Sequence, residues 1–241
     1  IEEVESSSWK GLLNVMTHEI MNSIVPVSSL SDTLKKKVLS LKMNSSLTTA
    51  SDWEDLEVAL DTIHRRSDGL LRFAETYRNL SQKIIPNQHQ CNLYDLLHSV
   101  HTLMLPTMQQ KGIKFTLQTN QPDVTSLIDK DLIEQVVINL VTNAMFALKE
   151  HKDPEINLFS GCDNEKHPYL TVVDNGCGIS PEIRNKIFIP FFTTKKNGNG
   201  IGLCISREII KAHRAKLHIQ SKENIGSAFT ILFQATAQTE Y

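Results

Sequence analysis

A histidine followed at once by a carboxylate stands near the start of the chain. His18 precedes Glu19, and Asn22 lies four residues beyond His18, so a helix would place Asn22 and His18 on one face. A neutral imidazole nitrogen is a capable nucleophile toward phosphorus, and a neighbouring carboxylate can accept the other ring proton during the attack. A lone helical histidine is most often an ordinary surface residue, so this string alone leaves both interpretations open.

Two asparagines spaced by four residues, and an aspartate, stand out in the second half of the chain. Asn139 and Asn143 would point the same way from a helix, where their amide oxygens could ligate Mg²⁺ or simply form a polar pair on a solvated face. Asp174 directly follows an apolar strand, so its carboxylate could accept a hydrogen bond from an adenine amino group. Gly176 and Gly178 would let the backbone approach such a base closely, although Asp-Asn-Gly is also a common turn.

An aromatic cluster and a glycine-rich loop follow. Residues 188–195 read Phe-Ile-Pro-Phe-Phe-Thr-Thr-Lys, an aromatic run closed by two hydroxyls and a cation, which predicts part of a lid hinge. Residues 198–203 read Gly-Asn-Gly-Ile-Gly-Leu and lead into a helix, a pattern typical of backbone amides and a helix N-terminus that hold phosphate groups. A single glycine-rich loop is weak evidence by itself.

Two heptad runs predict the helices that carry His18. Apolar residues recur every seventh position from about residue 8 to residue 41, and a second run follows the polar break at 42–46. The seams consist of Leu13, Ile20, Ile24, Val27, Leu34, Val38 and Leu41 in the first run, and Trp53, Leu56, Leu60, Ile63, Leu70, Ala74 and Tyr77 in the second. One hairpin cannot cover both seams, so we expect two chains to form a dimeric four-helix bundle, from which His18 faces outward.

The pattern changes after Pro86, where mixed helices and strands replace the heptads. We place the domain boundary there, with a helical hairpin over residues 1–85 and a second domain over residues 86–241. Predicted helices cover residues 92–110, 129–150 and 200–213, and predicted strands cover residues 113–117, 156–159, 169–173, 216–220 and 229–233. The expected fold class is therefore α plus α/β, with an α/β sandwich in the second domain.

The order of these strings resembles the catalytic core of the sensor histidine kinases. The string His18-Glu19-Ile20-Met21-Asn22 resembles the phosphoacceptor box of that family. Four later strings, with Gly-Ser-Ala-Phe near the end, resemble the N, G1, F and G2 boxes of the ATP-binding fold shared with Hsp90, gyrase and MutL. The string Pro-Phe-Phe-Thr-Thr-Lys resembles the nitrogen-regulation type of sensor kinase in particular.

The chain also departs from the common pattern of that family. Met21 stands where arginine is usual, and the proline is Pro26 instead of the residue directly after the asparagine. Phe146 stands where many members have a lysine or arginine that reaches the phosphates. We therefore expect Lys195 or Lys196 to stabilise the γ-phosphoryl charge.

The resemblance implies a homodimeric enzyme that uses ATP and Mg²⁺ to phosphorylate His18 and passes the phosphoryl group to an aspartate on a response-regulator receiver domain. It implies catalytic roles for His18, Glu19 and Asn22, with Asn22 orienting water in a reverse, phosphatase reaction, and it implies Asn143 as the metal ligand. The implied nucleotide contacts are Asn139, Asn143, Asp174, Gly176, Gly178, Thr193, Thr194, Lys195, Gly198, Gly200, Ile201, Gly202 and Leu203. Asn139 stands where hydrolases of this superfamily carry a water-activating glutamate, which favours phosphoryl transfer over hydrolysis.

Composition disfavours several other function classes. Twenty-five basic and 27 acidic residues give a formal net charge of -2, so we expect neither nucleic-acid binding nor membrane contact by this segment. The scattered cysteines Cys91, Cys162, Cys177 and Cys204 predict free buried thiols and a cytoplasmic location. Two alternatives to the kinase stay open: an ATPase motor of the gyrase or Hsp90 kind, and a catalytically silent scaffold that binds a partner through the bundle.

Overall fold

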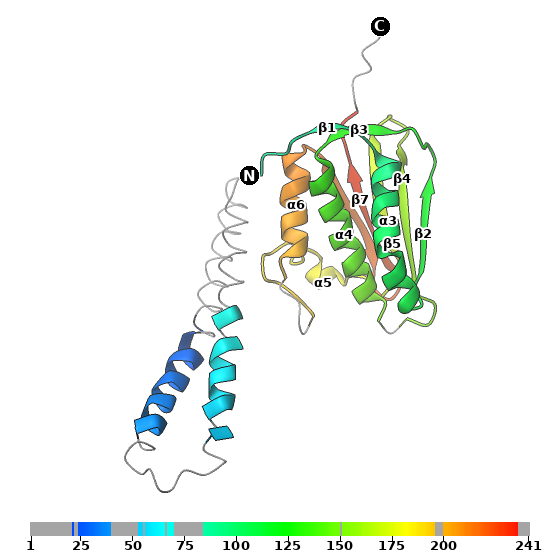
Figure 1. Ribbon diagram of the computed structural model, residues 1–241. Coiled ribbons are helices and arrows are strands. Elements are labelled where there is room, and N and C mark those ends of the chain that lie inside the picture. The colour runs from blue at the N-terminus through cyan, green and yellow to red at the C-terminus, as the bar shows by residue number, and fades with distance from the viewer. Residues whose placement is uncertain are drawn as a thin grey trace. The chain divides into compact units, whose positions relative to one another are not determined.

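The chain divides into two compact units, Ile1–Lys83 and Ile84–Tyr241. The computed structural model (Figure 1) describes residues 21, 24–39, 53–54, 56–65, 67–69, 84–149, 151–195 and 200–235. His18, Glu19 and Asn22 lie outside the described residues, so their predicted arrangement stays a prediction. The functional division into residues 1–85 and 86–241 stays a prediction as well.

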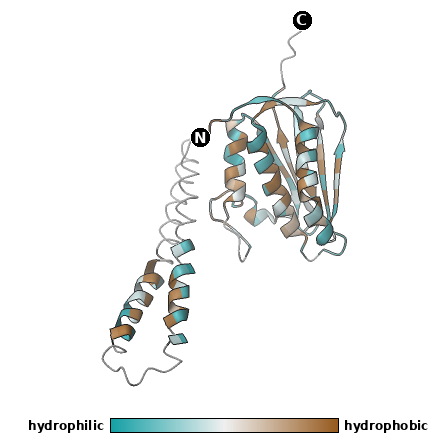
Figure 2. Ribbon diagram, viewed as in Figure 1, coloured by the Kyte–Doolittle hydropathy of each residue, from teal (hydrophilic) through white to brown (hydrophobic). Residues whose placement is uncertain are grey.

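The first unit contains two helical stretches, residues 24–39 and 56–65, which fall within the two heptad runs. Apolar and polar residues alternate along both stretches (Figure 2). Val38, Trp53 and Leu60 are 42%, 63% and 58% exposed, although all three are seam residues. They line an apolar groove of about 700 Å³. A single chain therefore leaves part of its seam open to water.

The second unit is built on a five-stranded sheet with the strand order β2-β4-β5-β7-β6. The bounds are Lys114–Thr119 for β2, Glu155–Cys162 for β4, Pro168–Asp174 for β5, Lys216–Lys222 for β6 and Gly226–Leu232 for β7. The β2 and β4 strands are parallel, and the other neighbours are antiparallel. The mixed sheet therefore has β4, β5 and β7 as interior strands, each paired on both sides, and β2 and β6 as its edges.

Three helices cover one face of this sheet (Figure 1). They are α3 (Leu93–Gln110), α4 (Lys130–Ala147) and α6 (Gly202–Ala212), and α5 (Pro181–Arg184) is a single short turn. The side chain of Asn92 caps α3 by accepting hydrogen bonds from the amides of Tyr94 and Asp95, and Asp129 caps α4 in the same way. Both long helices thus begin at residues whose side chains satisfy free backbone donors.

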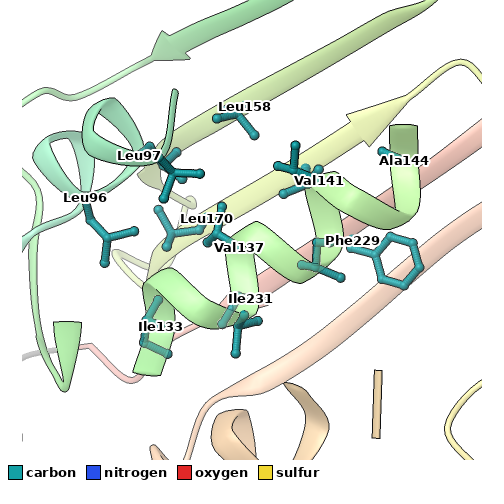
Figure 3. Close-up of a cluster of buried hydrophobic side chains, with 14 of the residues drawn as sticks. Leu96, Leu97, Ile133, Val137, Val141, Ala144, Leu158, Leu170, Phe229 and Ile231 are labelled. Carbon is teal, nitrogen blue, oxygen red and sulfur yellow. The ribbon is translucent and has the colours of Figure 1, made fainter. Parts of the chain in front are cut away.

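The core lies between the sheet and the helices (Figure 3). Leu158, Leu170 and Ile231 point from the strands toward α3 and α4, and all three are buried. Burial alternates along β5, where every second residue from Pro168 to Asp174 is buried. The alternation places the Asp174 side chain on the helix-covered side of the sheet.

The structure corrects several of the predicted elements. The strand pair β1 (His89–Asn92) and β3 (Thr125–Ile128) was not among them, because these segments are too short and polar to show alternation. The strand predicted at 229–233 is β7, which already begins at Gly226 because that residue pairs with Lys222. The helix predicted over 129–150 ends at Ala147. The prediction of buried thiols is wrong, since Cys177 is exposed and the other three cysteines, all free, are half-buried.

A buried histidine joins the C-terminal end of α6 to the N-terminal end of α4. The Asp129 amide donates to His213 Nε2 at 3.0 Å, so the ring proton lies on Nδ1, which donates to the Ile209 carbonyl at 2.8 Å. The Asp129 carboxylate in turn accepts a hydrogen bond from the Asn87 amide at 2.9 Å. These bonds fix α4, which carries Asn139 and Asn143, relative to α6, which begins with Gly202 and Leu203.

Candidate functional site

Asp174 lies at the end of β5 with only 6% of its surface exposed. Its Oδ1 accepts a hydrogen bond from the Gly176 amide at 2.9 Å. Burial raises the pKa of Asp174 above its ordinary value, although hydrogen bonds from the amides of Gly176 and Ser227 act in the opposite direction. A carboxylate has about four lone-pair sites, so this buried one can accept further hydrogen bonds. Its burial favours an N–H donor of a bound ligand as the partner over a hydrated cation.

The loop that follows Asp174 packs tightly against protein backbone. The Cys177 amide donates to the Ala147 carbonyl at the end of α4, and the Asn224 amide donates to the Cys177 carbonyl. Gly178 has a φ of +65°, and a Cβ there would lie 2.1 Å from the Lys222 carbonyl oxygen. Backbone packing is therefore a sufficient reason for glycine at residue 178, and the predicted approach to a base stays a prediction.

Replacing Gly178 with alanine is expected to lower the free energy of unfolding by about 3 kcal/mol or more, through positive φ and a backbone clash together. Gly112 is a matched control, because it has the same φ of +65° but nothing within 4 Å of an added Cβ. Gly112→Ala should cost only about 1 kcal/mol. Urea denaturation of both variants measures the difference, and equal losses would contradict the packing argument.

The two candidate asparagines of α4 have different partners. Asn139 Nδ2 donates to Ser206 Oγ at 2.9 Å, and a Cβ added to Gly202 would lie 2.1 Å from Asn139 Oδ1. Asn139 thus packs α4 against the start of α6, and its contact with nucleotide stays a prediction. Asn143, one turn further on, accepts a hydrogen bond on Oδ1 from Lys195 Nζ at 2.6 Å.

The aromatic and glycine-rich segments form a loop whose two ends are joined. The Phe191 amide donates to the Gly200 carbonyl at 2.8 Å, on either side of residues 196–199. Thr193 and Thr194 are exposed, and Thr193 Oγ1 accepts from the Lys195 amide at 3.0 Å. Gly198 lies outside the described residues. The join therefore holds the base of the loop beside the start of α6.

The start of α6 packs against the loop and the core. Ile201 is buried at the N-cap position, and Gly202 and Leu203, both half-buried, open the helix. Among the residues that the structure describes, no side chain forms a capping hydrogen bond with this helix. Its first amides are therefore free to donate to an anion.

The site brings together candidates from distant parts of the chain and adds residues that the sequence did not single out. Asn143 meets Lys195 although 52 residues separate them, and Asn139 meets Ser206 across 67 residues. Two further side chains, Phe146 and Lys149, lie beside Lys195. In the sequence, the one sign of this cluster of Phe146, Lys149 and Lys195 was that a phenylalanine stands at residue 146, where many histidine kinases have a lysine or arginine.

The amide oxygen of Asn143, which accepts from the Lys195 ammonium group, is of a chemical type that can ligate a metal ion. Within the described ranges, no group of three or more His, Cys, Asp or Glu side chains could hold a metal. A Mg²⁺ ion bound to nucleotide phosphates keeps several waters and needs only one or two protein ligands, so Asn143 Oδ1 alone fits such an ion.

Comparison with known proteins places the chain in a family. Residues 128–237 match the family described as histidine kinase-, DNA gyrase B- and HSP90-like ATPase. The solved catalytic domain of the histidine kinase ThkA is 34% identical, with a TM-score of 0.56, over 62% of this chain and 96% of that one. The chain belongs to the histidine kinases. Its second unit has the α/β fold of their catalytic domain.

Longer signalling proteins match more of this histidine kinase chain. AtoS of Escherichia coli K12, a signal transduction histidine-protein kinase, is 28% identical over 74% of this chain and 28% of its own length. The sensor histidine kinase ZraS of Salmonella typhimurium LT2 is 26% identical over 93% of this chain and 45% of its own length. The structure of ThkA in complex with the response regulator protein TrrA covers 99% of this chain and 65% of that one, with 26% identity and a TM-score of 0.65.

The chain spans less than half the length of these two curated relatives. Within the part of the chain that the structure describes, no helix is long and apolar enough to cross a membrane.

Proposed function

We propose that this chain binds ATP and Mg²⁺ in its second unit and transfers the γ-phosphoryl group to His18. The buried carboxylate of Asp174, at the end of a central strand of a histidine kinase fold, carries the proposal. An adenine amino group can donate to a buried carboxylate, and water would compete poorly for the same oxygen. The uncapped start of α6 supports phosphate binding at the other end of the nucleotide.

The transfer step requires a nucleophile and a proton acceptor. A ring nitrogen of His18 forms a bond to the γ-phosphorus, the bond from that phosphorus to the bridging oxygen breaks, and ADP leaves. Glu19 accepts the proton from the other ring nitrogen. A Mg²⁺ ion bound to the phosphates supplies charge neutralisation, and Asn143 Oδ1 would be its protein ligand. Lys195 stabilises the charge on the transferred group.

The remaining predicted nucleotide contacts surround these residues. Gly176 and Gly178 flank the adenine, and the lid residues with the start of α6 enclose the phosphates. This second group comprises Thr193, Thr194, Gly198, Gly200, Ile201, Gly202 and Leu203. The described contact of Asn139 with Ser206 supports an indirect role for Asn139, in which it positions α6.

The product phosphohistidine is proposed to serve as donor to an aspartate on a response-regulator receiver domain. A related kinase, ThkA, has been solved in complex with a response regulator protein, TrrA, which supports a partner of this class. In the reverse direction, Asn22 would orient a water molecule for hydrolysis of the partner's aspartyl phosphate. Residue 139 is an asparagine, which cannot activate water as a glutamate does, and this favours transfer to a protein nucleophile over hydrolysis of ATP.

Incubation of the full chain with γ-labelled ATP and Mg²⁺ tests the proposal and its alternatives. A histidine kinase gives label on protein that is labile in acid and stable in alkali. An ATPase motor gives free phosphate, and a silent scaffold gives neither product. Free phosphate without protein-bound label would overturn the proposed transfer.

Homodimerisation through the first unit is the second part of the proposal. The apolar groove beside Val38, Trp53 and Leu60 supports it, because these large side chains are more than a third exposed in one chain. A second copy of the same hairpin would cover them in a four-helix bundle. The bundle itself stays a proposal.

Sedimentation of the full chain at micromolar concentration is expected to show a dimer. Val38→Glu places a charge in the groove and should shift the equilibrium to monomer, because a buried unpaired carboxylate costs several kcal/mol. Val58→Glu is the matched control, since Val58 is 65% exposed and does not line the groove. If Val38→Glu remains as dimeric as Val58→Glu, the groove is not the interface.

A further inference from the structure

Two lysines share one aromatic ring at the C-terminal end of α4. Lys149 Nζ lies 4.4 Å from the centroid of the Phe146 ring, and Lys195 Nζ lies 4.7 Å from it. Both distances are within the range of a cation–π interaction. Lys195 comes from the predicted lid segment, so the ring of Phe146 contacts one ammonium group from the turn just after α4 and one from a distant part of the chain.

The same cluster includes a candidate ligand of the metal. Lys195 Nζ donates to Asn143 Oδ1 at 2.6 Å, one turn before Phe146 on α4. Lys195 therefore contacts the atom that is proposed to face the phosphates, and Lys149 contacts the same ring as Lys195. When a metal-bound nucleotide takes that oxygen, Lys195 must release it, and the ring of Phe146 remains as a second attachment point that keeps the ammonium group nearby.

The cluster has an excess of positive charge. Among the described residues, neither Lys149 nor Lys195 forms an ion pair with an acidic side chain. The two ammonium groups lie 4.4 Å and 4.7 Å from the centroid of the same ring, so two cations are held near each other. Like charges at short range repel, and a polyanion between them would relieve this repulsion.

We propose that Phe146 is a positioning residue which gathers Lys149 and Lys195 into a cationic seat for the terminal phosphates of ATP. Lys149 is thereby assigned a contact with phosphate, and Phe146 acts through the two lysines and does not touch the reacting atoms. This inference rests on the proposed function, since it requires that ATP binds in the second unit.

Calorimetric titration of the full chain with Mg-ATP and with AMP tests the seat. Lys149→Met is expected to weaken binding of ATP about fivefold, the loss typical of one exposed ion pair. Binding of AMP should change less than twofold, because AMP lacks the terminal phosphates. Lys152→Met is the matched control: it removes the same charge from an exposed residue three positions away, and it should leave both affinities unchanged.

The ring is tested by a pair of substitutions at residue 146. Phe146→Leu keeps an apolar side chain but removes the ring face, so it should weaken ATP binding at least as much as Lys149→Met. Phe146→Tyr keeps the ring face and should restore affinity to within twofold of the unsubstituted chain. Because the Phe146 side chain is 36% exposed, neither substitution leaves a cavity in the hydrophobic core.

Three outcomes would overturn the seat. The first is equal ATP affinity in Lys149→Met and Lys152→Met. The second is a parallel loss of ATP and AMP binding, which would indicate a general structural effect. The third is a failure of Phe146→Tyr to restore binding. Absence of ATP binding by the unsubstituted chain would instead overturn the proposed function itself, and the seat with it.

Discussion

A chain in which His18 is replaced by glutamine is expected to take up no label from γ-labelled ATP. Glutamine has no nitrogen lone pair of comparable nucleophilicity, so the N–P bond cannot form. Glu19→Gln should instead retain a slow reaction, reduced about 100-fold, because the proton acceptor is lost while the nucleophile remains. Rates of incorporation from gel autoradiography at saturating Mg-ATP separate the two variants.

A matched control keeps the His18 test specific. His98→Gln makes the same change at an exposed histidine on α3, outside the proposed site, and should label at the rate of the unsubstituted chain. The ATP affinity of His18→Gln should be unchanged, because the proposed nucleotide contacts are all in the second unit. Persistent labelling of His18→Gln would show that another side chain is the acceptor.

Asp174→Asn is expected to weaken ATP binding about 100-fold. The change keeps the size of the side chain but replaces a charged acceptor and places an amide donor in a buried position, so the adenine amino group loses its partner. Calorimetric titration with Mg-ATP measures the loss. An unchanged affinity would mean that the nucleotide binds elsewhere.

The same variant provides a separate test of burial at Asp174. The pKa of this carboxyl is raised in the folded chain, so its contribution to stability is fully present below the unfolded value of about 3.9 and is lost as the pH rises through the folded pKa. Asp174→Asn lacks this contribution. The stability of the unsubstituted chain relative to the variant, from urea denaturation without nucleotide, should therefore decline as the pH rises from 4 to 7.

The sequence alone predicted the layer type and the main elements of the second unit. Alternating apolar residues in β5 and β7, and the helical repeat in α4, encode which side of each element is buried, because burial depends mainly on local periodicity. The position of Asp174 at the end of β5 followed from the apolar run before it. Short elements without periodicity, such as β1 and α5, were beyond this kind of reasoning.

Tertiary structure decided which side chains meet. The local pattern gave Asn139 and Asn143 one common direction. Only the packing of α4 against α6 and against the loop that carries Lys195 gave Asn139 its partner Ser206 and Asn143 its partner Lys195. Residue 178 likewise has to be glycine because the backbone of the distant β6–β7 turn lies against it. The sequence around residue 178 does not reveal this contact. The physical reason is that contacts across 40 or more residues depend on how whole elements pack, and side chains at these junctions carry no periodic signal of their partners. The contact of Lys149 and Lys195 with one Phe146 ring is the clearest case, because nothing in the sequence pointed to Lys149 and the fold makes all three residues neighbours.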